Sequence, residues 1–398
     1  MTRRVVEGLN LLDGSWYADD PHAVWTALRR DAPGCYDPAS AVWGITKYHD
    51  VLAIEKDPKT FSSHRAPRPH GDHLPMMISM DDPEHQRRRS LVSRGFTPKR
   101  VAGHEPLLRE LCTSIIDRVC EEGRCDFVWD IAAPLPLLVI ADMLGLSDMH
   151  EELLRWSEEL MRPTPATITP EQMASGARTI QEFRDSQLEV IADRRRNPRD
   201  DVITTLCEAE IDGDRLDDES IVQETLLILI GGDETTRHVM SGGMLALLER
   251  PEQLEALRDG SADVTVAVEE MIRWVSPVQN MARTATRDVT VRDQQVEEGD
   301  QLILFYPSAN RDEEVFEDPQ RFDIGRRPNP HIAFGFGTHF CLGASLARLE
   351  CRVMFGELLR RLPDIRLAPD AVLPRRASNF VSGLETMPVE FTPAAREG

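Results

Sequence analysis

HIAFGFGTHFCLGASLARLE, residues 331–350, surrounds one cysteine with glycines and then runs directly into a helix pattern. Two glycines precede Cys341, and Gly343 follows it. Glycines at this density allow tight turns and a close approach of the backbone to a flat ligand. The apolar spacing that follows predicts a helix over residues 346–359. Cys341 would then sit just before a helix N-terminus, where the helix dipole and free N–H groups stabilise a thiolate.

The same run resembles the haem-binding signature of the cytochromes P450, Phe-x-x-Gly-x-x-x-Cys-x-Gly. Its four fixed positions are occupied by Phe334, Gly337, Cys341 and Gly343. The resemblance implies that the cofactor is haem b, that Cys341 is the axial ligand of its iron, and that Phe334 and Gly335 lie beside it. A thiolate is the ligand with which haem iron favours O–O cleavage. The alternative is a buried cysteine in a Gly-rich turn, since free cysteines are usually buried.

Composition excludes several other classes of protein. The chain has 398 residues and a net charge of −22, which argues against nucleic acid as a partner because phosphate binding needs a broad basic surface. No stretch approaches the roughly 18 apolar residues that span a bilayer. Charge and glycine come too early in the N-terminal residues for a signal peptide. We therefore expect a cytoplasmic protein. The Pro-rich stretches are short, which favours a single domain over residues 1–398.

Helical periodicity dominates the chain. It predicts helices over residues 21–30, 83–95, 106–120, 170–195, 217–248 and 262–275. Strand-like runs are short, at residues 42–46, 284–291, 301–306 and 389–391 and around Val381. The polar, Pro-rich residues 310–330 are too long for an ordinary connection, which suggests a functional reason. The predicted fold class is mainly α with small β-sheets (α+β), and the resemblance implies the large triangular cytochrome P450 fold.

A polar sequence interrupts the apolar pattern of residues 217–248. Gly231 and Gly232 cost roughly 1 kcal/mol each in mid-helix, and an acid and a hydroxyl follow at Glu234 and Thr235. Residues that disfavour an apolar helix interior in this way are expected at a functional site. The alternative is a kink in the helix at which all polar groups are hydrogen-bonded. The run resembles the family's oxygen-activation motif, [Ala/Gly]-Gly-x-[Asp/Glu]-Thr. The resemblance implies that Gly232 lies close to the haem and leaves room for dioxygen, and that Glu234 and Thr235 are catalytic residues that relay protons.

Glu270 and Arg273 are three residues apart on a predicted helix, so they share one face. Such pairs are common on solvated helices. The family resemblance implies instead a buried ion network that Arg321, in the polar stretch, completes. A network of this kind positions the cysteine loop and takes no part in the chemistry.

Haem carries two propionates, which prefer Arg or His as partners. His85 and Arg89 lie four residues apart on one helix face and resemble the family's His-x-x-x-Arg. Arg283 follows the Glu-x-x-Arg helix at the family's usual offset, and His331 opens the cysteine loop. The joint pattern predicts that these four residues bind the cofactor, although each alone could be an ordinary polar residue.

The resemblance also implies which segments line the substrate pocket. Their side chains are mostly aliphatic or Met, with no Arg or Lys placed to hold a carboxylate, and this suits a large neutral apolar ligand. Met-rich stripes also fill protein cores. The predicted pocket residues are Met76, Met77, Ile78, Leu226, Ile230, Val278, Met281 and Phe380.

Residues 231–243 and 274–283 look like segments of actinobacterial, especially mycobacterial, steroid side-chain monooxygenases. This likeness implies oxidation of a terminal methyl, C26 or C27, of cholesterol or cholest-4-en-3-one. The reaction would use O2 and electrons from a ferredoxin and its reductase. Arg87 and Arg88 could form a local docking patch for that acidic partner, or simply a solvated helix face.

Three alternatives remain open at this stage. The first is a P450 monooxygenase of another large apolar substrate, such as a fatty acid, another sterol or a polyketide. The second is a peroxygenase, whose relatives carry Arg-Pro where this chain has Glu234 and Thr235. The third is a non-enzymatic haem sensor or lipid carrier, which would need neither a proton relay nor a face for an electron donor.

Overall fold

Helices form most of the molecule in the computed structural model, which describes residues 4–5, 8–19, 21–161, 169–211 and 213–398. The mainly α fold class predicted from the sequence is confirmed. In chain order the α-helices are α1 (Ser15–Ala18), α2 (Pro21–Asp31), α3 (Tyr48–Glu55), α4 (Glu84–Val92), α5 (Pro98–Gly103), α6 (Glu105–Asp117), α7 (Pro134–Met143), α8 (His150–Met161), α9 (Pro170–Arg196), α10 (Val202–Glu208), α11 (Asp218–Leu248), α12 (Pro251–Arg258), α13 (Val264–Val275), α14 (Tyr306–Ala309) and α15 (Ala344–Arg361).

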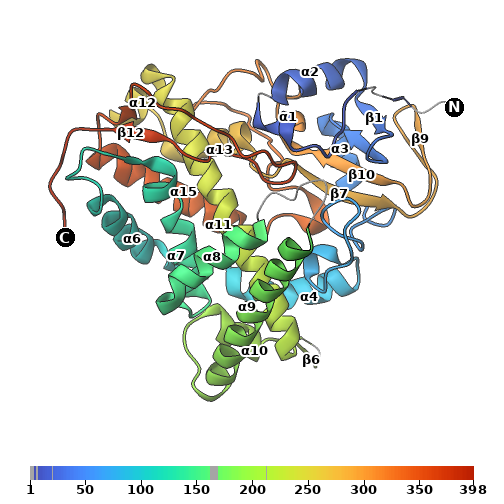
Figure 1. Cartoon of the computed structure of the whole chain (residues 1–398), viewed down its shortest axis with the longest axis horizontal. Helices are drawn as coiled ribbons and strands as arrows, with labels where there is room; N and C mark the ends of the chain where they lie inside the picture. The colour runs from blue at the N-terminus through green and yellow to red at the C-terminus, as the bar shows by residue number, and fades with distance from the viewer. Residues whose placement is uncertain (1–3, 6–7, 20, 162–168, 212) are drawn as a thin grey trace.

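The largest sheet joins the beginning of the chain to residues 280–305, as the blue and orange strands of Figure 1 show. Its strand order is β1 (Gly34–Asp37), β2 (Val42–Ile45), β10 (Gln301–Phe305), β7 (Asn280–Ala285) and β3 (Phe61–Ser62). Only β2 and β10 pair in parallel, and all five residues of β10 are buried. The smaller sheets are β11 (Arg366–Leu367), β12 (Pro388–Glu390) and β4 (Arg124–Asp126); β5 (Glu210–Ile211) and β6 (Asp214–Arg215); and β8 (Val289–Val291) and β9 (Gln294–Val296).

The 31-residue helix α11 crosses the middle of the molecule (Figure 1). Its N-terminus is capped by Asp217, whose carboxylate accepts the N–H of Ser220 at 2.8 Å. The helix packs against α7, α8, α13 and α15, and most of its second half is buried. It runs through both glycines of the polar motif, so residues 231–235 lie at the centre of the fold.

The structure departs from the sequence predictions in several places, and helices α3, α8, α10 and α12 were not among the predicted ones. Residues 284–291 belong to two strands, β7 and β8, and between them the side chains of Thr286 and Arg287 bind Lys59 and Thr60. The helix predicted over residues 83–95 ends earlier, as α4, and continues as a short 3-10 turn. Helix α7 was not predicted because it is apolar on nearly every side and therefore lacks a helical periodicity.

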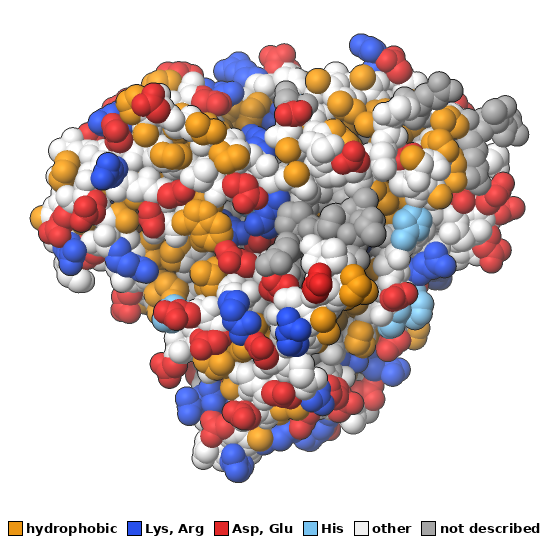
Figure 2. Space-filling view, in the orientation of Figure 1, with side chains coloured by type: hydrophobic (Ala, Val, Ile, Leu, Met, Phe, Trp, Pro, Cys, Tyr) orange, Lys and Arg blue, Asp and Glu red, His pale blue; other side chains and the backbone are white. Residues whose placement is uncertain are grey.

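Charged side chains of both signs are dispersed over the face shown in Figure 2. This distribution agrees with the net charge of −22 and gives no large basic surface on that face. None of the helices within the described ranges is both long enough and apolar enough to cross a membrane.

Candidate functional site

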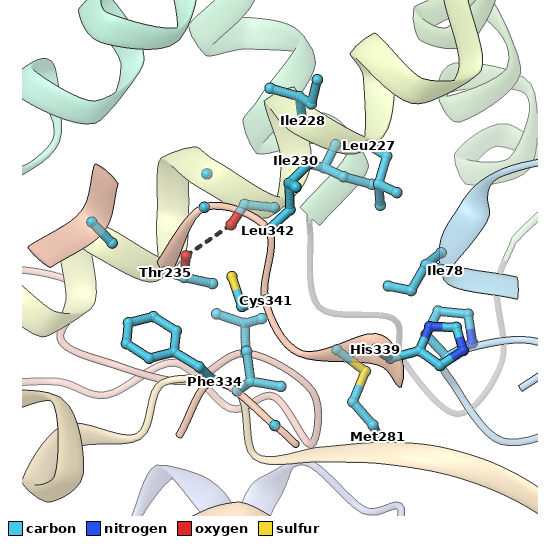
Figure 3. Close-up of a pocket in the computed structure, with 18 of the residues that line it drawn as sticks. Ile78, Leu227, Ile228, Ile230, Thr235, Met281, Phe334, His339, Cys341 and Leu342 are labelled. Carbon is cyan, nitrogen blue, oxygen red and sulfur yellow. Dashed lines mark hydrogen bonds between the residues drawn. The ribbon is translucent and has the colours of Figure 1, made fainter. Parts of the chain in front are cut away.

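A cavity of about 680 Å³ lies between α11 and the cysteine loop. Cys341 and Thr235 both reach this cavity, one from the loop before α15 and the other from α11 (Figure 3). Phe334, Gly335 and Gly232 line it as well. The sequence motif around the cysteine and the motif in mid-helix therefore meet at one site, although they are more than 100 residues apart.

The cysteine loop is closed by its own backbone. Cys341 N–H donates to the carbonyl of Phe334 at 2.9 Å, and a 3-10 turn, Gly337–His339, lies between them. Gly337 has a φ of +69°, and a Cβ there would come within 2.6 Å of the carbonyl oxygen of Glu55 on α3. Only glycine fits this position, because any side chain would push the loop away from α3.

Cys341 lies three residues before the start of α15, and its accessible surface faces the cavity. Burial within the protein raises the pKa of its thiol. The N–H groups of Gly343 and Ala344 and the charges of Arg89 and Arg348 act in the opposite direction. The helix-start stabilisation predicted from the sequence is thus present, but burial outweighs it as long as no positive ion lies beside the sulfur.

Four basic side chains converge on the edge of the cavity: His85, Arg89, Arg283 and His339. His85 and Arg89 share one face of α4, as predicted. His339 was not predicted, although it stands only two residues before Cys341 in the cysteine loop. The ring of His339, labelled in Figure 3, has its centroid 4.1 Å from that of the His85 ring.

This basic cluster fits a ligand with carboxylates at one edge. The buried Nε2 atoms of His85 and His339 have no hydrogen-bond partner among the described residues. Burial, followed by the charge of Arg283 and by His85, lowers the pKa of His339 to about 2. A buried polar atom without a hydrogen-bond partner costs free energy. Guanidinium groups that lie close together also repel each other, and an anion bound between them would relieve both effects. The donor set therefore agrees with the propionates of haem, and the single sulfur of Cys341 agrees with an axial ligand to its iron.

His331 does not reach the cavity, so the prediction that it binds the cofactor is wrong. Its Nε2 lies 3.0 Å from Glu269 on α13, and Arg348 on α15 binds the same carboxylate at 2.6 and 2.9 Å. Burial alone would raise the pKa of Glu269, but hydrogen bonds from His331 and Arg348 lower it to about 2. His331 instead ties the start of the cysteine loop to two helices.

The predicted ion network around Glu270 exists, but its third member was misassigned. Arg273 binds Glu270 with two hydrogen bonds of 2.7 Å, and both side chains are fully buried. Arg326 completes the network, with its Nε 3.2 Å from Glu270 Oε2. Arg321 contributes only its backbone carbonyl, which accepts from Arg273 at 3.2 Å, while the residue itself is exposed. The prediction of Arg321 as the ionic partner is therefore wrong.

Thr235 is the hydroxyl of the α11 motif that faces the cavity. Its Oγ1 donates to the carbonyl of Gly231 at 2.8 Å, as the dashed line in Figure 3 shows. The space beside Gly231 is open, whereas a Cβ on Gly232 would lie 2.5 Å from Ile140 of α7. Of the two glycines, Gly231 thus leaves free space and Gly232 mainly allows α7 to approach α11.

Glu234 points away from the cavity and is completely buried. Arg237 donates to it at 2.8 Å, and Arg376 donates to both of its oxygens at 2.6 and 2.7 Å. Arg376 is held in turn by Glu385 at 2.9 Å. No local sequence signal predicts Arg376, because it comes from the C-terminal segment, 142 residues further along the chain.

Two further buried acids lie near the cavity and were not predicted from the sequence. Burial raises the pKa of Asp233 to about 6, and Ser157 on α8 donates to it at 2.7 Å. Burial and the charge of Asp233 raise the pKa of Glu350, which lines the cavity from α15, to about 8. Burial of Glu350 thus favours its neutral, protonated form.

The wall of the cavity is largely the one predicted. Leu226 is the exception, since it points into the core, while Leu227 and Ile228 face the cavity in its place. The prediction was wrong by one residue, which corresponds to a rotation of about 100° on a helix. Seven predicted residues line the cavity: Met76, Met77, Ile78, Ile230, Val278, Met281 and Phe380.

The wall also contains a cation that was not expected there. Arg68 lines the cavity, and its guanidinium lies 4.3 Å from the ring centroid of Phe380. The prediction that no Arg or Lys is placed to meet a carboxylate is therefore wrong. Arg87 and Arg88 do not form a free basic patch either, because Arg87 pairs with Asp214 at 3.0 Å and Arg88 turns inward, with 17% of its side chain exposed.

Comparison with known proteins agrees with a haem site at this cavity. The cytochrome P450 family model matches residues 142–363. A steroid C26-monooxygenase from Mycobacterium tuberculosis is 46% identical over 389 residues, 97% of this chain and 98% of the relative. A methyl-branched lipid omega-hydroxylase from Mycobacterium bovis is 38% identical, over 95% of this chain and 93% of the relative.

Solved structures share the fold over nearly the whole chain. P450BioI, in complex with an acyl carrier protein ligated to hexadec-9Z-enoic acid, aligns with a TM-score of 0.88 and 32% identity, covering 95% of this chain and 99% of that one. CYP109E1 from Bacillus megaterium, in complex with testosterone, aligns with a TM-score of 0.86 and 31% identity, covering 94% and 99%.

Proposed function

The chain belongs to the cytochrome P450 family and is a P450 monooxygenase, and we propose that it hydroxylates the terminal methyl, C26 or C27, of the side chain of cholesterol or cholest-4-en-3-one. The observation that carries the proposal is the meeting of Cys341 and Thr235 in one cavity with an aliphatic and Met-rich wall. The 46% identity to a steroid C26-monooxygenase supports the sterol substrate.

The family implies a haem cofactor, and we infer that it is haem b. When bound, haem supplies the iron at which dioxygen is reduced. Cys341 would hold that iron through its sulfur. The remaining residues proposed to hold the cofactor are His85, Arg89, Arg283 and His339 at the propionates, and Gly232, Phe334 and Gly335 along the ring.

Thr235 and Glu234 have different proposed tasks. Because the Thr235 hydroxyl donates its proton to Gly231, its oxygen lone pairs are free to accept a hydrogen bond from a water or a protonated group in the cavity. Glu234 lies one residue earlier and is held by two guanidinium groups outside the cavity. Glu234 would carry protons to Thr235 only when its side chain leaves one of those partners.

The cavity wall supports a long apolar molecule as the substrate. A volume of about 680 Å³ lies within the range of roughly 300–1,000 Å³ that is common for ligand pockets. Leu227, Ile228, Ile230 and Met281 present only apolar atoms to it, and Figure 3 shows their side chains around the sulfur and the hydroxyl. An aliphatic side chain that enters this space excludes water from Thr235.

A second candidate substrate is a methyl-branched lipid. The 38% identity to a methyl-branched lipid omega-hydroxylase favours it, and Arg68 supplies the cation that a fatty-acid carboxylate would need. Both candidates end in an apolar chain, so the two proposals differ in the polar end of the substrate and agree on the site of oxidation.

The electron donor is proposed to be a ferredoxin with its reductase. The cysteine loop exposes Phe336 (39%) and Phe340 (40%), and the ammonium group of Lys56 lies 5.2 Å from the Phe336 ring centroid. An acidic ferredoxin that docks over this loop would come close to the sulfur of Cys341.

Titration of the purified haem-loaded enzyme with cholest-4-en-3-one tests the substrate. We expect the sterol to displace an axial water and shift the iron to high spin, and mass spectrometry should then find oxygen at the terminal methyl. Cholesterol and a methyl-branched long-chain fatty acid are measured in parallel.

A spin shift with the fatty acid and none with either sterol would replace the sterol proposal by the branched-lipid one. Arg68→Gln provides the matched variant, because it should weaken binding of the carboxylate much more than binding of a neutral sterol.

A further inference from the structure

Glu224 is a carboxylate in an apolar part of α11, one turn before the cavity residues Leu227 and Ile228. Its side chain is completely buried. One oxygen accepts the backbone N–H of Met77 at 2.9 Å, and the same oxygen lies 3.6 Å from Nη1 of Arg88 on α4. The other oxygen, like Arg88 Nη1, has no hydrogen-bond partner among the described residues.

This arrangement is a poor way to stabilise a fold. A buried ion pair repays its desolvation only with good geometry and satisfied partners, and this pair is long and half satisfied. Burial raises the pKa of Glu224 to about 7, against the charge of Arg88 and the hydrogen bond from Met77. The second carboxylate near Arg88 is Asp217, the N-cap of α11. An apolar pair would fill the same space at lower free energy, so the acid needs another reason.

The group that Glu224 holds is part of the cavity wall. Met77 begins a 3-10 turn, Met77–Ser79, and residues 76–78 all line the cavity. The preceding residues 63–76 contain no helix or strand. The Met77 amide thus fastens the end of a long irregular segment to α11, through one hydrogen bond between elements 147 residues apart.

We propose that Glu224 is a positioning residue for substrate specificity: it fixes the wall formed by residues 76–78 against α11 through the amide of Met77, and Arg88 keeps its side chain in place. The proposal rests on the proposed function only in taking this cavity as the substrate pocket. It makes no assumption about which lipid enters.

The test separates the positioning role from a merely structural one. Glu224→Met leaves the largely buried Arg88 without its nearest carboxylate and should destabilise the protein. The double variant Glu224→Met with Arg88→Leu removes both charges and should recover most of the lost melting temperature, yet it still lacks an acceptor for the Met77 amide. Asp201→Asn is the matched control, because it weakens a buried pair with Arg194 that lies outside the cavity.

Two readouts apply to the haem-loaded protein. Hydrogen exchange of the amides of residues 76–80 should be faster in the double variant than in the parent and unchanged in Asp201→Asn. The dissociation constants for cholest-4-en-3-one and for phenylimidazole, a bulky haem ligand unrelated to the substrate, should rise about five- to tenfold, as expected for one lost backbone hydrogen bond.

A double variant that keeps both parental affinities and the parental exchange rate would overturn the proposal. If the sterol binds neither the parent nor the double variant, the substrate assignment fails. Hydrogen exchange and the affinity for phenylimidazole then still decide the role of Glu224.

A second pair of variants covers the case in which the double variant does not fold. Met77→Pro and Met77→Ala both lose the Met side chain, but only the proline variant also loses the backbone N–H. Met76 has φ −124° and ψ 153°, which a residue before proline adopts readily, and proline is tolerated at the first position of a helical turn. Faster exchange and weaker binding in Met77→Pro than in Met77→Ala supports the proposal; equal values overturn it.

Discussion

At the residue scale, the Thr235 hydroxyl is the group that the proposed proton relay needs in the cavity. Thr235→Ala removes that acceptor while the neighbouring backbone stays in its helix. We expect substrate affinity to change little and the fraction of reducing equivalents lost as peroxide to rise several-fold. NADH consumption, product and peroxide, measured together with a surrogate ferredoxin system, give that fraction.

Thr235→Ser is the control, because serine keeps the hydroxyl and can make the same bond to Gly231. If Thr235→Ala loses no larger fraction of its reducing equivalents as peroxide than the parent, Thr235 takes no part in the relay.

Arg326 and Arg321 make a second test at this scale. Arg326→Ala removes one of the two guanidinium groups that bind the buried Glu270, and we expect a loss of about 2–4 kcal/mol in the free energy of unfolding. Arg321→Ala keeps the backbone carbonyl that Arg273 binds, so the change should stay within about 0.5 kcal/mol. Denaturant unfolding of both variants measures the difference, and equal losses would contradict the assignment of Arg326.

These residues show what a sequence can and cannot predict about a site. His85 and Arg89 could be placed together because their i, i+4 spacing determines a shared helix face. Arg326 could not be told from Arg321, because both lie in an irregular stretch where spacing does not determine direction. His331 was misassigned because its partner, Glu269, comes from another helix and captures the ring.

At the scale of elements, Glu269 joins α13 to α15 and to the cysteine loop. Its pKa is about 2, below the ordinary value of 4.5. A lowered carboxylate pKa stabilises the fold above the unfolded-state value, and the stabilisation is lost as the pH falls from about 4.5 through about 2. Glu269→Gln should therefore unfold more easily than the parent at pH 6, by about 2 kcal/mol after allowance for partial exposure, and the gap should close toward pH 2.5.

Unfolding of both proteins in urea at several pH values checks this expectation. Glu255→Gln is the control, because the Arg258–Glu255 pair is long, 3.7 Å, and its glutamate is 65% exposed. A gap for Glu269→Gln that stays constant with pH would contradict the lowered pKa.

The elements themselves were predictable to different degrees. Helices α9 and α11 were placed to within one residue, because their apolar pattern is long and their caps, Thr169 and Asp217, are typical N-cap residues. The parallel pairing of β2 with β10 was not predictable, since it joins residues about 260 positions apart that share no local signal.

At the scale of the whole molecule, the fold brings buried donors together around a space for a cofactor. Two carboxylates lie beside this group of Arg89, Arg283 and two histidines: Glu55 is 3.3 Å from Arg283, and Asp82 is 3.5 Å from Nδ1 of His85. The Nε2 atoms of both histidines still have no hydrogen-bond partner among the described residues. A ligand that binds only the folded state stabilises it by mass action. We expect the haem-free protein to melt at a clearly lower temperature than the haem-loaded one.

Differential scanning calorimetry of the protein with and without haem measures this shift. Arg89→Ala and Arg283→Ala should reduce the shift, because each removes a proposed propionate partner. An unchanged melting temperature on haem loading would contradict the cofactor site described here.

The ferrous–CO absorption spectrum tests most directly whether Cys341 binds the haem iron. We predict the red-shifted Soret band of thiolate ligation in the parent and its loss in Cys341→Ser, with the remaining free cysteines unchanged. A Soret band typical of imidazole ligation in the parent, or a red-shifted band that survives in Cys341→Ser, would show that Cys341 does not bind the iron.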